Sequence, residues 1–161
     1  MRKFIILFFI LYFLSLFQTS FFNFLKVQPN FILVLFLTLL IFEKQKKSGL
    51  FIAILGGLFL DIFSDFILGT TIITFVLIYL LMMIILKFVR KVNLYLFPLS
   101  IIFGTIFFNL SLSIISFILP KIFHQQSILQ FNLNLALLFE VLYNLILSFI
   151  TFYILKLLKR I

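Results

Sequence analysis

Four acidic residues are present in the 161-residue chain, and three of them decide what chemistry it can perform. Asp61 and Asp65 lie four residues apart in an apolar stretch at residues 49–69, and Glu140 lies in another apolar run, one helical turn before Asn144. A carboxylate at the centre of a transmembrane helix costs about 2.5–3.5 kcal/mol on insertion scales, so such residues usually have a partner or a functional role. We therefore expect Asp61 and Glu140 to face the interior of a helix bundle, whereas Asp65 lies at a boundary.

The same acidic residues do not form the constellation of an aspartyl protease. Asp61 and Asp65 share one helical face, one turn apart, so they cannot oppose each other across a peptide as two catalytic carboxylates do. Cysteine is absent and histidine occurs once, which excludes thiol catalysis, cysteine-ligated metals and a zinc-type histidine pair. The sequence therefore predicts a protein that is not an enzyme, with no catalytic residue, metal or other cofactor.

The composition is that of a membrane protein. Hydrophobic residues make up 65% of the chain and charged residues only 11%, whereas soluble domains are about half apolar and about a quarter charged. The formal net charge is +9, but the basic residues occur in short clusters between apolar runs. Such clusters are typical of loops beside a lipid bilayer, so we expect the bilayer, and not nucleic acid, to be the surroundings.

Six apolar runs predict one all-α transmembrane domain over residues 1–161. The spans cover about residues 4–24, 31–42, 49–63, 70–86, 95–119 and 133–155. The second span is only ~18 Å long, well under a ~30 Å hydrocarbon core, so it must borrow residues from the preceding turn or lie where the protein thins the bilayer. Asn30, after Pro29, is expected to cap this helix. Pro98 fits the first turn of the fifth helix, and Pro120 is expected to end it.

The basic residues set the orientation. With six spans, both termini lie on one side of the membrane, and 11 of the 13 lysines and arginines lie on that side: Arg2, Lys3, Lys44, Lys46, Lys47, Lys87, Arg90, Lys91, Lys156, Lys159 and Arg160. Lys26 and Lys121 lie on the other side. Because lysine and arginine favour the cytoplasmic side, both termini are predicted to be cytoplasmic.

Small and polar residues inside the spans predict where helices meet. Gly56 and Gly57 lie side by side in the third span, and glycine in membranes favours close helix approach. Gly57 and Asp61 are four residues apart, so the close contact and the carboxylate are expected on one face. Asn109 and Asn144, in the fifth and sixth spans, are expected to form interhelical hydrogen bonds.

The segment at residues 28–69 resembles the bacterial rod-shape-determining MreD family. The resemblance rests on Pro29-Asn30 before the second span, the basic loop, Gly57-x-x-x-Asp61, and Leu68-Gly69 eight residues after the aspartate. Tyr143-Asn144 is a weaker similarity in the last span. The resemblance to this family implies a non-enzymatic scaffold of the cell-elongation complex in the bacterial cytoplasmic membrane. The implied partners are the single-span protein MreC, MreB filaments, the RodA glycosyltransferase and a penicillin-binding transpeptidase.

The resemblance also implies a fold similar to the substrate-binding subunits of energy-coupling-factor transporters. A vitamin-transport subunit of that type is therefore the alternative function, although the first span has no alanine or glycine of a docking motif. For the scaffold, we expect a lipid-facing or outer-leaflet groove, near Pro29, Asn30, Asp61 and Glu140, to hold the transmembrane part of the single-span partner. The alternative is that these residues only hold the bundle together. The candidate partner-binding or intramembrane polar residues are Pro29, Asn30, Gly57, Asp61, Gly69, Asn109, Glu140 and Asn144.

Overall fold

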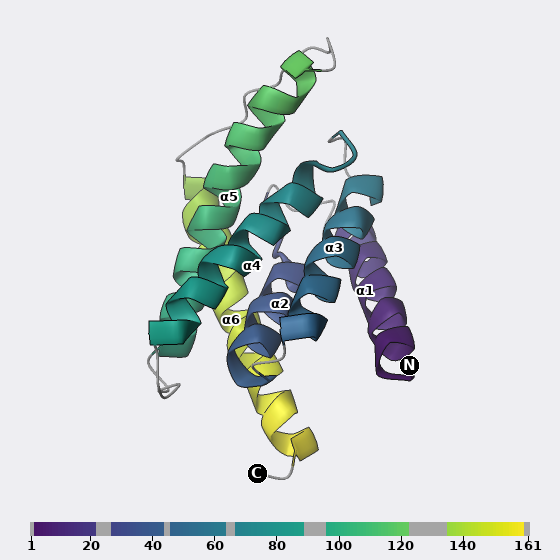
Figure 1. Cartoon of the computed structure of the whole chain (residues 1–161). Coiled ribbons are helices and arrows are strands. Elements are labelled where there is room, and N and C mark those ends of the chain that lie inside the picture. The colour runs from purple at the N-terminus through teal and green to yellow at the C-terminus, as the bar shows by residue number, and fades with distance from the viewer. Residues whose placement is uncertain are drawn as a thin grey trace.

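The computed structural model describes residues 2–21, 27–43, 46–63, 67–88, 96–122 and 135–159, and nearly all of them are helical. The helices are α1 (Arg2–Phe21), α2 (Phe31–Glu43), α3 (Lys46–Phe63), α4 (Thr70–Phe88), α5 (Leu96–Ile122) and α6 (Leu135–Lys159). The prediction of an all-helical chain with six helical segments is confirmed. Successive helices run in alternating directions, so the start of α1 and the end of α6 lie at the same end of the bundle (Figure 1).

Three of the helices are long and apolar enough to cross a membrane. Their apolar stretches are Thr70–Lys87 in α4, Phe97–Pro120 in α5 and Leu135–Ile154 in α6. The other three helices carry shorter apolar stretches, at Phe4–Ser20, Phe31–Phe42 and Gly49–Phe63. Large apolar side chains are exposed along the outer faces of α1, α4, α5 and α6. These are the properties of a protein embedded in a membrane, where lipid takes the place of water around an apolar surface.

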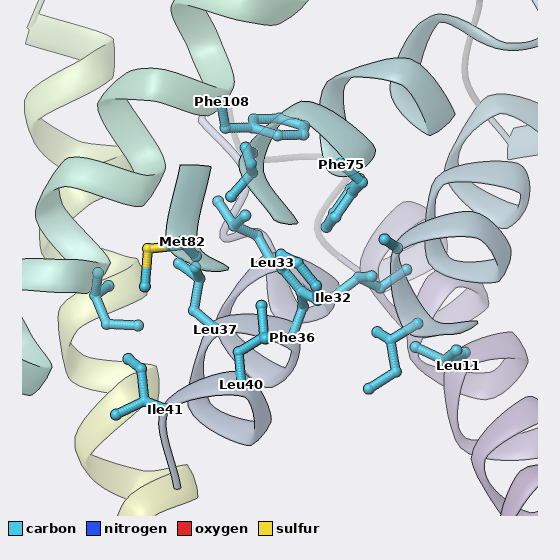
Figure 2. Packing of buried hydrophobic residues seen from close by; sticks show 14 of the residues in the cluster. Leu11, Ile32, Leu33, Phe36, Leu37, Leu40, Ile41, Phe75, Met82 and Phe108 are labelled. Carbon is cyan, nitrogen blue, oxygen red and sulfur yellow. The ribbon is translucent and has the colours of Figure 1, made fainter. Parts of the chain in front are cut away.

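The short helix α2 forms the centre of the bundle. It packs against α1, α3, α5 and α6, and its side chains make up much of the hydrophobic core (Figure 2). Phe36 of α2 meets Phe75 of α4 edge to face, with ring centroids 5.5 Å apart, and Phe75 meets Phe108 of α5 at 5.4 Å. Because protein surrounds α2 on most sides, its 13-residue length does not have to match the thickness of a bilayer.

Helices α3 and α4 are in close contact at Gly57. A Cβ atom placed on Gly57 would lie 2.6 Å from the Cα atom of Ile72, so only glycine fits against the α4 backbone at this point. A Cβ atom on Gly56 would lie 2.7 Å from Cγ2 of Ile32, in α2. The prediction that this glycine pair marks a close helix contact is confirmed, and the two glycines face different neighbours.

Of the two predictions made for the prolines of α5, one is confirmed and the other is wrong. Pro98 lies in the first turn of α5, as expected. The prediction that Pro120 ends this helix is wrong, because α5 continues to Ile122 with Pro120 inside it. The proline lies in the last turn, where its fixed φ suits a helix and its missing N–H removes only one hydrogen bond.

Candidate functional site

The N-terminal end of α4 begins at a glycine. The amide N–H of Ile73 donates to the carbonyl oxygen of Gly69 at 2.9 Å, which makes Gly69 the N-cap residue. Its φ of +102° lies in the left-handed region, where glycine is favoured. Without a side chain, Gly69 cannot cap the helix itself, so the free N–H groups of the first turn need acceptors from elsewhere.

Asp61 of α3 supplies those acceptors. Its Oδ2 atom accepts from the amide N–H of Gly69 at 2.7 Å, and its Oδ1 atom accepts from the amide N–H of Thr71 at 2.9 Å. Asp61 is buried, with only 3% of its surface exposed. The N-terminus of a helix carries a partial positive charge, so a carboxylate placed there is stabilised by charge as well as by hydrogen bonds.

The hydroxyl group of Thr71 ties this cap to the glycine contact. Thr71 Oγ1 lies 2.6 Å from Asp61 Oδ1 and 2.6 Å from the carbonyl oxygen of Gly57, so its single proton lies between two acceptors. Gly57, Asp61 and Gly69 therefore belong to one compact unit that joins α3 to α4. We call the residues Gly57, Asp61, Gly69 and Thr71 the aspartate cap.

The N-terminal end of α2 is capped by neutral groups. Asn30 Oδ1 accepts from the amide N–H of Leu33 at 3.0 Å, which confirms the predicted N-cap. Gln18 of α1 extends its Oε1 atom to the amide N–H of Phe31 at 3.1 Å. The amide N–H of Asn30 donates to Oδ1 of Asn144, in α6, at 2.8 Å. Three helices thus meet at the start of α2.

The Asn144 side chain continues this network into α5. Its Nδ2 atom donates to Oγ1 of Thr105 at 3.1 Å, and the hydroxyl of Thr105 donates to the carbonyl oxygen of Ile101 at 2.9 Å. Asn144 and Thr105 are both 0% exposed. We call Gln18, Asn30, Thr105 and Asn144 the amide cap.

A further polar pair lies beside the amide cap, between α5 and α6. Asn109 Nδ2 donates to Oε2 of Glu140 at 2.9 Å and to the carbonyl oxygen of Thr105 at 3.0 Å. Both Asn109 and Glu140 are half-buried. The predicted interhelical hydrogen bonds of Asn109 and Asn144 are therefore confirmed. Sequence reasoning did not assign a role to Gln18 or Thr105, because nothing in their local pattern distinguishes them from other polar residues in the apolar runs.

The structure sorts the candidate residues into two groups. Gly57, Asp61 and Gly69 lie in the aspartate cap, between α3 and α4. Asn30 and Asn144 lie in the amide cap, Asn109 and Glu140 lie beside it, and the buried Pro29 precedes Asn30 in the chain. The hydrogen bonds of Asp61 described above run to α4, whereas those of the second group join α1, α2, α5 and α6. Asp65, Lys26 and Lys121 lie outside the residues whose side chains the structure describes.

Both caps are closed arrangements. Within the described part of the chain, every buried side-chain nitrogen or oxygen has a hydrogen-bond partner, and no group of three or more His, Cys, Asp or Glu residues could hold a metal ion. The polar atoms of the two caps therefore act on the protein's own backbone and side chains. No protein-family model, curated protein or solved structure matches the chain.

Proposed function

We propose that this protein is a non-enzymatic scaffold of the bacterial cell-elongation complex, related to MreD. In this role it binds the single-span protein MreC in the cytoplasmic membrane and helps to organise peptidoglycan synthesis and to maintain cell shape. MreB filaments, RodA and a penicillin-binding transpeptidase are the other members of the complex. The proposal includes six membrane crossings with both termini in the cytoplasm.

The observation that carries the proposal is the joint role of the residues behind the resemblance. Gly57, Asp61 and Gly69 are separated in the sequence, yet they form the single unit of the aspartate cap. Asn30, from the other part of the resemblance, caps the start of the central helix α2, and the buried Pro29 precedes it. The residues behind the resemblance therefore fix the starts of two helices, α2 and α4. Fixed helix starts favour a rigid bundle, and a scaffold needs a rigid bundle.

The occupied carboxylate of Asp61 supports a non-enzymatic role. A catalytic carboxylate must reach a substrate or a water molecule. Asp61 is buried and accepts hydrogen bonds from the α4 backbone. Its chemistry is therefore used in holding two helices together.

The burial of the caps changes where a partner could bind. Asn30 is 5% exposed and Asp61 is 3% exposed, so a groove lined by these two side chains is not open at the surface. Their contribution to partner binding is therefore indirect, through the shape of the bundle. Glu140 and Asn109 are half-buried and remain able to contact a neighbour.

Co-purification from membranes tests this function. We expect the tagged protein to retain the MreC of the same bacterium, and an Asp61→Leu variant to lose abundance together with partner binding. Asp61→Asn, which keeps one acceptor oxygen, is the matched control and should retain both in part. A purified protein that binds a vitamin-sized solute tightly and does not bind MreC would establish the transport alternative. A reporter fusion that places the C-terminus outside the cell would also contradict the proposal.

A further inference from the structure

One carboxylate oxygen of Glu140 is left without a hydrogen bond by the described residues. Oε2 of Glu140 accepts from Asn109 at 2.9 Å, whereas no described donor reaches Oε1. Because every fully buried side-chain oxygen in the described part of the chain has a partner, Oε1 is not fully buried, in keeping with the half-buried state of Glu140. In Glu140, Oε2 is therefore held by Asn109, whereas Oε1 is free to accept a hydrogen bond from another molecule.

The open oxygen lies near the middle of the longest helix. Asn109 is the central residue of α5 (Leu96–Ile122), so at ~1.5 Å per residue it lies ~20 Å from either end. Glu140 is hydrogen-bonded to it and is the sixth residue of α6 (Leu135–Lys159), ~8 Å from the start of that helix. With α5 and α6 across the membrane, this oxygen lies within the apolar stretches of both helices, Phe97–Pro120 and Leu135–Ile154, and therefore inside the hydrocarbon core. Acyl chains, which surround it, have no hydrogen-bond donors.

The helix that carries Glu140 is also the least covered of the three long ones. Only 11% of the residues in the apolar stretch of α6 are buried, compared with 33% in α4 and 39% in α5. Ala136, Glu140 and Tyr143 share a face by helical spacing, and Ala136 is exposed. A small residue at such a position allows the backbone of another helix to come close. Exposed apolar side chains flank this face at Phe139 and Ile146.

We propose that this face of α6 binds a transmembrane helix of a partner protein through a donor side chain that hydrogen-bonds to Oε1 of Glu140. The donor is a hydroxyl, amide or ammonium group near the middle of the partner helix. The inference rests on the proposed function, in which the partner is a single-span protein. Asn109 orients the carboxyl group, and Ala136 provides the space for close packing.

Model peptides in lipid vesicles test this inference. The full chain, labelled with a donor dye, is reconstituted in phosphatidylcholine vesicles with an acceptor-labelled poly-leucine peptide of about 20 residues that carries one central lysine. An all-leucine peptide is the control. We expect energy transfer to show about tenfold tighter association of the lysine peptide, as model studies of intramembrane hydrogen bonds indicate.

Three variants locate the binding site. Glu140→Leu should abolish the preference for the lysine peptide. Ala136→Ile should weaken this preference while leaving Glu140 and its bond to Asn109 in place. This variant therefore distinguishes loss of the binding surface from a general disturbance of the fold. Leu80→Ala, on an exposed part of α4, should leave the preference unchanged.

The results also separate this inference from the proposed function. Equal association of both peptides with the wild-type chain would overturn the inference, even if MreC is retained in membranes. Self-association of the chain that depends on Glu140 would overturn it too, because a second copy would then cover the face. Binding of the lysine peptide without any binding of MreC would support the α6 face and contradict the elongation role.

Discussion

Two helix starts described above, those of α2 and α4, are buried, and their N–H groups are satisfied by different chemical groups. The first turn of α4 is capped by one carboxylate, Asp61, from the helix that precedes it in the chain. The first turn of α2 is capped by neutral amides, which come from α2 itself, α1 and α6. In both cases the orphan N–H groups of a helix end are buried away from water and need an acceptor.

The two caps differ in how many residues supply the acceptors and in how far apart those residues lie in the chain. The charged cap is local, since Asp61 and its backbone donors are only eight and ten residues apart in the chain. The neutral cap is distributed, since Asn30 and Asn144 are 114 residues apart. We therefore expect stability to depend steeply on one residue at α4 and more gradually on several residues at α2.

Replacing Asp61 should have the largest effect. Asp61→Leu leaves the amide groups of Gly69 and Thr71 without these acceptors, and each buried group left unpaired costs about 1–3 kcal/mol. We expect a loss of about 3 kcal/mol or more in the free energy of unfolding, measured by denaturation in mixed detergent micelles. Asp61→Asn should lose less, because its amide oxygen can still accept one bond. If the leucine variant is as stable as the wild type, the capping role of Asp61 is wrong.

Replacing Asn144 should have an intermediate effect. Asn144→Leu leaves the amide N–H of Asn30 without an acceptor and removes the bond to Thr105, with an expected loss of about 2 kcal/mol. Thr105→Val removes only the second bond and should lose about 0.6 kcal/mol, the average for a hydrogen bond between membrane helices. The same denaturation measurement applies, and equal losses for the two variants would contradict the order proposed for this cap.

Replacing Gln18 should have a smaller effect than replacing Asn144, and it tests the coupling within the amide cap. Gln18→Leu removes one acceptor, that of the Phe31 amide, and should lose about 1 kcal/mol. Combined with Asn144→Leu, which acts on the same helix end, it should give a loss that differs from the sum of the two. Combined with Asp61→Leu it should be additive, because the two caps share no residue. Additivity in both pairs would show that the amide cap is not a single network.

The sequence was sufficient for features that depend on neighbouring residues. The apolar runs located all six helices, the Pro29-Asn30 pair predicted a capped helix start, and the spacing of Gly57 and Asp61 predicted a shared face. Each of these follows from the period of a helix or from the chemistry of one side chain. The wrong prediction at Pro120 arose because a proline removes only the hydrogen bond of its own residue, whereas the N–H groups of the residues after it can still donate to the preceding turn.

The partners of the polar residues could not be predicted in the same way. The role of Asp61 depends on the positive φ of Gly69, which turns the chain so that two N–H groups face back toward α3. The roles of Gln18 and Asn144 depend on which helices pack around α2, and hydropathy carries no information on that. For the same reason, the sequence indicated a second helix too short for a bilayer but not its central position.

The distance in sequence between Asn30 and Asn144 also determines the order in which the protein can be completed. Gln18 precedes Phe31 in the chain, so this acceptor is already synthesised when α2 is made. Asn144 is made 114 residues after Asn30, and until then the Asn30 amide lacks this acceptor. Helix α6 therefore completes the hydrogen bonding at the start of α2, and a nascent chain truncated before α6 lacks this acceptor for its central helix.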